Sequence, residues 1–232
     1  MPFNDRMTVH AGEAGFVAAI YEGSLRNLAR SCGSPIEVLV GPGDHVLPGA
    51  PLLHADRMRL PDPEDFATSA RRLIELGPSR TPAQDIRFCL ARVSEMAVRA
   101  MSPGTNDPYT TVNAIHEITT ALADLAGRPD PWPGVLADPG DELPVLVLPR
   151  PARAELIAEV FNELRPWVTS APIAVAALTT MGQALMAASA DREIAEVVRA
   201  QLRALAEQVE NQPTLTGLDR IRLLDRITDV TG

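Results

Sequence analysis

Apolar residues recur at helical spacing through most of the chain after residue 65. Their three- and four-residue intervals predict amphipathic helices at 65–76 and 82–101. Asp107-Pro108 is a typical N-cap and first-turn pair, so the next helix is expected to run from there to Gly127. Four more helices are predicted at about 151–168, 172–188, 191–210 and 216–229. Residues 62–232 are therefore expected to form one mainly helical domain.

Before residue 57 the pattern changes to short runs separated by glycine and proline. Residues 15–20 and 36–40 predict strands, and residues 21–32 predict a short helix between them. The first ten residues are expected to be a disordered or extended lead-in, and residues 57–65 a linker. This part of the chain is thus predicted to be a small β-rich module over residues 1–57.

The turn sequence Gly43-Asp44-His45-Val46, with Pro48 to Leu53 after it, resembles a turn of the barrel-sandwich domains found in biotinyl and lipoyl carriers. The lysine that such carriers modify is absent, so the resemblance implies only the β scaffold. The predicted fold class is α+β, with a barrel-sandwich-like module followed by a helical bundle. Strand-like runs at 135–137 and 144–148 are compatible with an added short β-hairpin.

Residues 171–189 carry no charge, which raises the question of a membrane span. Alanine dominates the segment, and Thr179, Thr180 and Gln183 interrupt it, so its hydrophobicity is low for a lipid-facing helix. A buried central helix is the better interpretation.

The acidic composition excludes several partners. A formal charge of -9 and a pI of about 4.9 argue against nonspecific nucleic-acid binding and against docking on anionic membranes. All 21 basic residues are arginine, so Schiff-base chemistry, a P-loop lysine and a biotinyl-lysine are excluded. Two isolated cysteines without a CxxC motif favour a reducing compartment, and hence the cytoplasm. The composition identifies no cofactor.

The richest polar chemistry lies in Ser102-Pro103-Gly104-Thr105-Asn106-Asp107-Pro108-Tyr109-Thr110, between two helical patterns. Asn106 and Asp107 are the strongest candidates for a ligand site, joined by Ser102 and Thr110. The structural alternative is that Asp107 caps a helix while Asn106 takes a turn conformation. Because Asp107 opposes an anion, a cation or a hydroxyl-bearing ligand would fit better.

Two neighbouring sets of residues are weaker candidates. Asn113, His116 and Glu117 are spaced to share one face of the helix that follows Asp107, where they form either a site or a solvated stripe. Arg80 and Asp85 precede the previous helix and form either a ligand contact or a turn-spanning ion pair. His45 and His54 have no third ligand at recognisable spacing, so no metal site is predicted.

The segment from Arg80 to Leu90, together with the Ser102–Thr110 string, resembles an uncharacterised bacterial family of predicted membrane proteins, domain of unknown function 2254. The Gly15-Phe16-Val17 strand and the Gly43–Val46 turn fit the same pattern, and the resemblance covers most of residues 12–190. It implies an architecture and a candidate site, with no established reaction. Family members typically carry N-terminal membrane helices, which this chain lacks, and His116 stands where the family pattern has an acidic residue.

Three readings follow. The favoured one is a soluble ligand-sensing or protein-interaction domain, related to a membrane protein and homo-oligomeric. The second is an enzyme that acts on a small polar substrate through the Ser102–Thr110 stretch and His116. The third is a self-assembling scaffold that packs its alanine-rich helix at 171–188 against a symmetry mate.

Overall fold

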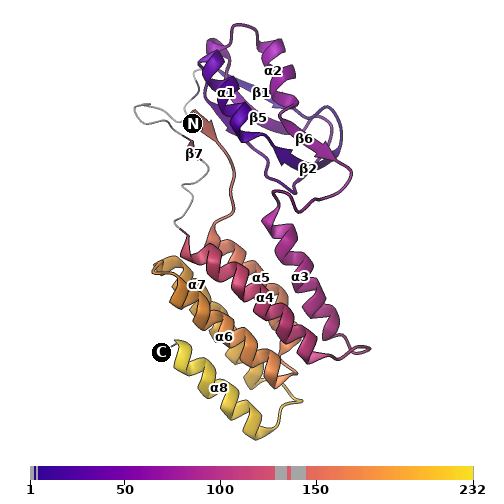
Figure 1. Ribbon diagram of the computed structural model, residues 1–232, viewed down its shortest axis with the longest axis vertical. Helices are drawn as coiled ribbons and strands as arrows, with labels where there is room; N and C mark the ends of the chain where they lie inside the picture. The colour runs from indigo at the N-terminus through magenta and orange to yellow at the C-terminus, as the bar shows by residue number, and fades with distance from the viewer. Residues whose placement is uncertain (1–2, 4, 129–134, 137–144, 232) are drawn as a thin grey trace. The chain divides into compact units, whose positions relative to one another are not determined.

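The structure is a computed structural model that describes residues 3, 5–128, 135–136 and 145–231. The chain divides into two compact units (Figure 1). One, the mixed unit, comprises Met1–Phe88 and Asp130–Arg150, and the other, the helical unit, comprises Cys89–Pro129 and Pro151–Gly232. The predicted division near residue 60 therefore differs from the observed one, because residues 63–88 and the 135–147 strands belong to the mixed unit.

The mixed unit contains two open sheets with helices packed against them. Its elements are β1 (Arg6–His10), β2 (Gly15–Ile20), α1 (Glu22–Cys32), β3 (Ile36–Val38), β4 (His45–Val46), β5 (Pro51–Asp56), η1 (Arg57–Arg59), α2 (Pro63–Arg71), β6 (Ile74–Gly77), β7 (Val135–Leu136) and β8 (Leu146–Val147). The strand orders are β1-β5-β3-β8-β7 and β4-β2-β6. The mixed α and β content agrees with the predicted class, and the barrel-sandwich likeness stays a prediction.

Two segments of this unit contradict the sequence-based prediction. The expected disordered or extended lead-in contains strand β1, which is paired antiparallel with β5. The expected helix over residues 65–76 ends at Arg71, and Ile74–Gly77 forms strand β6, antiparallel to β2. The expected linker also contains η1 and the start of α2. Strands β1 and β6 each depend on a partner strand that is distant in sequence, whereas η1 and α2 are capped locally by Asp56 and Asp62.

The predicted hairpin is present, and it joins the first sheet. β7 and β8 pair antiparallel, and β8 also pairs parallel with β3, at Ile36 with Leu146. Residues 137–144, which include part of both predicted runs, lie outside the described residues. The hairpin is therefore part of the mixed unit, although it follows α4 in sequence.

The helical unit is a bundle whose helices match the periodicity of the sequence. Its helices are α3 (Ile86–Ala100, of which the first three residues belong to the mixed unit), α4 (Pro108–Gly127), α5 (Arg153–Val168), α6 (Pro172–Ala188), α7 (Arg192–Glu210) and α8 (Gly217–Thr231). α4 and α6 are neighbours, as are α5 and α7, and α8 packs against α6 and α7 (Figure 1). Their apolar faces form one core around Ile115, Phe161 and Leu178.

α6 is the central helix that the uncharged segment predicted. Eight of its 17 residues are buried, and Gly182 allows α7 to approach so closely that an added Cβ would lie 2.9 Å from Leu202 Cδ1. Helices α4, α7 and α8 pack against α6 within the bundle, and the packing of this helix against a symmetry mate stays a prediction.

Side-chain contacts define the two ends of the bundle. The guanidinium of Arg153, at the start of α5, donates to the carbonyls of Ala126 and Arg128 at 2.8 and 2.6 Å and to Asp191 Oδ2, the N-cap of α7, at 2.8 Å. At this end Gly127 of α4 also approaches the Ala188 carbonyl of α6. The opposite end, here called the turn end, therefore holds the α3–α4 turn, the α5–α6 turn and the α7–α8 loop.

Candidate functional site

The turn between α3 and α4 contains the strongest sequence-predicted residues, and its backbone groups bond one another. Asn106 has a φ of 44°, in the left-handed region that asparagine tolerates better than most residues. The N–H groups of Thr105 and Asn106 donate to the Ser102 carbonyl at 3.0 and 2.9 Å. The Asp107 N–H donates to the Ala100 carbonyl at 2.7 Å. The stretch is thus a compact connection that ends one helix and starts the next.

Asp107 is the N-cap of α4. Its Oδ1 accepts the N–H groups of Tyr109 and Thr110, each at 3.1 Å, and its Oδ2 accepts the Thr110 hydroxyl at 2.6 Å. These bonds, the Thr110 hydroxyl first, lower the pKa of Asp107. Both carboxylate oxygens accept hydrogen bonds from the first turn of α4, which is the arrangement of a helix cap.

The face of α4 that follows the cap is exposed. Asn113, His116 and Glu117 all lie on it, as their spacing predicts, together with Thr110. His116 comes nine residues after Asp107, which places it about 13 Å further along the axis and about 180° around the helix. The carboxylate and the imidazole therefore do not converge. Sequence reasoning missed Tyr109, whose side chain is 74% exposed on the same face.

Arg80 and Asp85 form the ion pair that the structural alternative predicted, within the mixed unit. Arg80 Nε donates to Asp85 Oδ2 at 2.7 Å and Arg80 Nη2 donates to Oδ1 at 2.9 Å. The Asp85 side chain is 3% exposed, whereas that of Arg80 is 33% exposed. The hydrogen bonds to Asp85 raise the pKa of Arg80, and its guanidinium carbon lies 5.3 Å from the centre of the Phe88 ring.

The segment before α3 is fastened to strand β2 by side chains. The Gln84 amide accepts the Ile20 N–H at 2.8 Å and donates to the Ile20 carbonyl at 3.2 Å. Gln84 thus bonds strand β2, and α3 begins at Ile86 rather than at the predicted residue 82. Asp85 Oδ1 instead accepts the Phe88 N–H at 2.9 Å, within the first turn of α3.

The Gly43–Val46 turn can lie against the Arg80–Asp85 ion pair because residue 43 has no side chain. Gly43 has a φ of +91°, and a Cβ added to it would lie 2.0 Å from Asp85 Oδ2 and 3.1 Å from Arg80 Nε. The neighbouring Asp44 carboxylate contributes to the raised pKa of Arg80. The Gly43–Val46 turn and the Arg80–Asp85 segment, which carry separate parts of the family resemblance, thus meet in one cluster. No local sequence signal predicted this contact.

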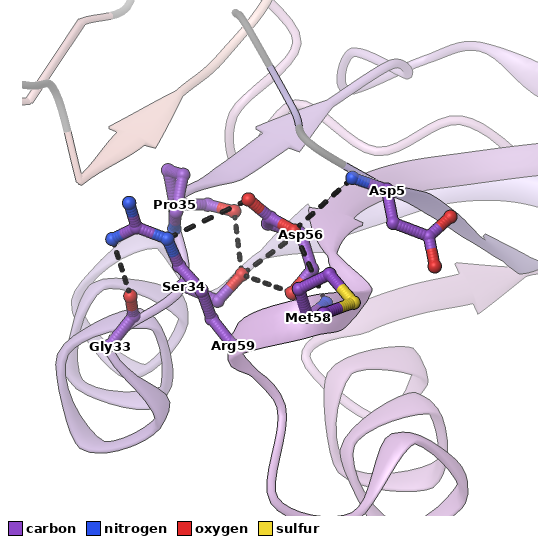
Figure 2. Close-up of polar contacts among 7 residues, drawn as sticks. All are labelled: Asp5, Gly33, Ser34, Pro35, Asp56, Met58 and Arg59. Carbon is purple, nitrogen blue, oxygen red and sulfur yellow. Dashed lines mark hydrogen bonds and ion pairs between the residues drawn. The ribbon is translucent and has the colours of Figure 1, made fainter.

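A second buried polar cluster was also not foreseen (Figure 2). Asp56 is 2% exposed, and its Oδ1 accepts the N–H groups of Met58 and Asp5 at 3.2 and 3.4 Å. The Asp56 N–H donates to Ser34 Oγ at 3.0 Å, and Arg59 Nε lies 3.6 Å from Asp56 Oδ2. The carboxylate caps η1 and connects it to the start of β1, so the cluster holds backbone segments together.

His45 and His54 lie on different sheets of the mixed unit. His45 on β4 contacts the Phe16 ring edge-on. His54 on β5 shares a 3.1 Å hydrogen bond with the Thr8 hydroxyl, and burial, followed by the charge of Arg6, lowers its pKa. In the part of the chain that the structure describes, no three His, Cys, Asp or Glu side chains are grouped as they would be around a metal ion.

The predicted candidates therefore fall into separate groups. Arg80 and Asp85 belong to the mixed unit, whereas Ser102, Asn106, Asp107, Thr110, Asn113 and His116 belong to the helical unit. Among the described residues, no helix combines the length and the apolar character needed to cross a membrane. The fold and these residues define a two-unit α+β protein with an exposed polar helix–helix turn.

The chain belongs to the family of predicted membrane proteins DUF2254, whose model matches residues 1–184. Uncharacterized proteins of Mycobacterium bovis and of two strains of Mycobacterium tuberculosis are each 31% identical to it over 159 residues. These matches cover 65% of this chain and 30% of each relative. No solved structure matches the chain. α7 and α8 lie beyond the segment that the family model matches.

Proposed function

We propose that this chain is a protein-interaction domain whose partner binds at the turn end of the helical unit. The observation that supports this most is the exposure of large apolar side chains around the turn. Tyr109, in the first turn of α4, is 74% exposed, Trp167 at the end of α5 is 47% exposed, and Ile173 at the start of α6 is 40% exposed. All three helix termini lie at the turn end.

This composition suits a protein interface. Tyrosine and tryptophan are enriched among the residues that dominate binding energies, and they are surrounded by polar groups at the rim. Asn106 and Thr105 supply exposed polar groups beside Tyr109. Because the turn satisfies its own backbone groups, its geometry is formed before binding, which lowers the entropy cost of association.

The other readings gain less support. An enzyme acting through the Ser102–Thr110 stretch and His116 would need an acid and a base that converge, and Asp107 and His116 lie on opposite sides of α4. A sensor that binds a cation or a hydroxyl-bearing ligand through Asp107 would compete with the cap, because this carboxylate already accepts the Tyr109 and Thr110 N–H groups and the Thr110 hydroxyl. We also propose that this chain lies in the cytoplasm and that its partner is a membrane protein.

A site-specific photocrosslinking experiment tests the proposal. Benzoylphenylalanine is introduced at Tyr109, or at Met58 as a control, since both side chains are 74% exposed and lie in different units. We expect a discrete crosslinked product in cells from position 109 alone. The product should disappear when Trp167 is changed to Ser. Equal crosslinking from both positions, or none from position 109, would refute an interface at the turn end.

A further inference from the structure

His54 lies in a row of polar side chains that crosses three strands of the first sheet. Its register partner on β1 is Thr8, and its register partner on β3 is Glu37. The Thr8 hydroxyl and His54 Nδ1 share a hydrogen bond of 3.1 Å. Arg6 lies on the same face as Thr8, because side chains alternate along a strand, and His10 is exposed on the other side of Thr8, after a register shift. Two basic side chains of β1 therefore flank the imidazole.

The surroundings of His54 oppose a positive charge on its ring. Burial, then the charge of Arg6 and, to a smaller extent, that of His10 lower the pKa of His54, whereas the charge of Glu37 raises it. Phe3 contacts the imidazole edge-on, with the ring centres 6.3 Å apart, and the Arg6 guanidinium carbon lies 5.5 Å from the centre of the Phe3 ring. The charges that oppose protonation thus belong to β1, and the charge that favours it belongs to β3.

Strand β1 is the element that can move away from the imidazole. It is an edge strand, since β5 is its only partner among the described strands. At its N-terminal end the Asp5 carbonyl accepts the Arg57 N–H at 2.8 Å, and the Asp5 N–H donates to Asp56 Oδ1 at 3.4 Å. At its C-terminal end Arg71 Nε donates to the His10 carbonyl at 2.9 Å. Opening of the strand therefore breaks few contacts with β5 and stops at His10.

We propose that protonation of His54 loosens β1 from β5, so that this N-terminal strand is an acid-sensitive edge of the mixed unit. When β1 opens, the imidazole gains contact with water and is separated from Arg6 and His10, while Glu37 stays beside it. The protonated ring is therefore more stable in the open state than in the closed one. Val9 of β1 is buried in the core, which keeps the strand closed at neutral pH.

The lowered pKa of His54 fixes the direction of this effect. An exposed imidazole has a pKa of about 6.5, so the open state binds the proton more tightly than the closed state. The closed state keeps its full stability above about pH 6.5 and loses it as the pH falls through the pKa of the closed state. At about pH 5.5 the open fraction can rise by at most about tenfold, because the open imidazole is then about tenfold more protonated than neutral.

Amide hydrogen exchange of the full chain at about pH 7.5 and about pH 5.5, corrected for the intrinsic pH dependence of exchange, measures this opening. Protection of residues 6–10 should fall by about three- to tenfold at the lower pH, and protection of α1 in the same unit should not change. His54→Gln keeps a group that can hydrogen-bond Thr8 but carries no charge, so its β1 protection should be equal at both pH values. His45→Gln, on β4 of the other sheet, is the matched control and should respond as the native chain does.

An NMR titration of the His54 ring tests the native chain without any substitution, and its pKa should lie below about 6.5. A pKa at or above that value, or β1 protection that is the same at both pH values in the native chain, would overturn the proposal. So would an equal loss of protection in His54→Gln, or a matching loss in α1, which would indicate general destabilisation by acid. These measurements concern the mixed unit, so their outcome is independent of the crosslinking experiment at Tyr109.

Discussion

Gly43 should be the position at which the smallest added group does the most damage. Replacing it with alanine adds one methyl group, at 2.0 Å from Asp85 Oδ2 and 2.6 Å from its Cγ. Carbon and oxygen atoms without a bond between them cannot approach so closely. The buried Asp85 carboxylate would have to move away from Arg80 and from the Phe88 N–H.

Gly49→Ala is the control that distinguishes the effect of this contact from that of backbone strain. Gly49 also has a positive φ, +82°, and a Cβ added there meets no atom within 4 Å. The left-handed backbone costs alanine about 1–2 kcal/mol at either position. At Gly43 the loss of the Arg80–Asp85 pair adds about 2–4 kcal/mol. This is less than the cost for a fully buried pair, because a third of the Arg80 side chain is exposed.

Differential scanning calorimetry of the full chain can measure the difference. For a unit of roughly a hundred residues, 1 kcal/mol lowers the Tm by about 4 °C. The transition of the mixed unit should therefore fall by about 8–16 °C more in Gly43→Ala than in Gly49→Ala. Hydrogen exchange should rise in peptides that contain Asp85 and Phe88, and only in the Gly43 variant.

A double-mutant cycle tests whether the contact with Asp85 causes the additional loss of stability. Asp85→Ala removes the atoms that the new methyl group would meet, so adding Gly43→Ala to that variant should cost only the strain of about 1–2 kcal/mol. If Gly43→Ala costs as much in the Asp85→Ala background as in the native chain, the contact is not the cause. Equal losses from Gly43→Ala and Gly49→Ala would refute the reasoning as well.

Two further predictions concern the helical unit. Arg153→Met should lower the free energy of unfolding, measured by urea titration, by about 3–5 kcal/mol. The reason is that the carbonyls of Ala126 and Arg128 and the Asp191 carboxylate lose a buried cationic partner. A loss below about 1 kcal/mol would contradict this. Asp107→Asn should reduce stability at neutral pH. Because the pKa of Asp107 is lowered in the folded chain, its contribution is complete above the unfolded pKa and disappears as the pH falls through the folded pKa. A difference between Asp107→Asn and the native chain that does not change with pH would contradict this assignment.

The sequence alone was sufficient for the helical unit. Apolar spacing predicted α4 to α8 to within a few residues, and Asp107-Pro108 marked a helix start that the structure confirms. These signals are local, since a helix closes its hydrogen bonds four residues away and its cap lies within the same turn. The uncharged composition of residues 171–189 similarly predicted the burial of α6.

Only the tertiary structure decided which segments of the mixed unit form paired strands and which candidate residues lie close together. Ile74–Gly77 is a strand because β2 offers it hydrogen bonds, although its own residues continue a helical pattern. Gln84 bonds Ile20, and Gly43 lies against Asp85, across separations of 64 and 42 residues. Helix geometry also separated Asp107 from His116 although the two are close in sequence. Strand pairing and side-chain packing join residues distant along the chain, so no local pattern could reveal these contacts.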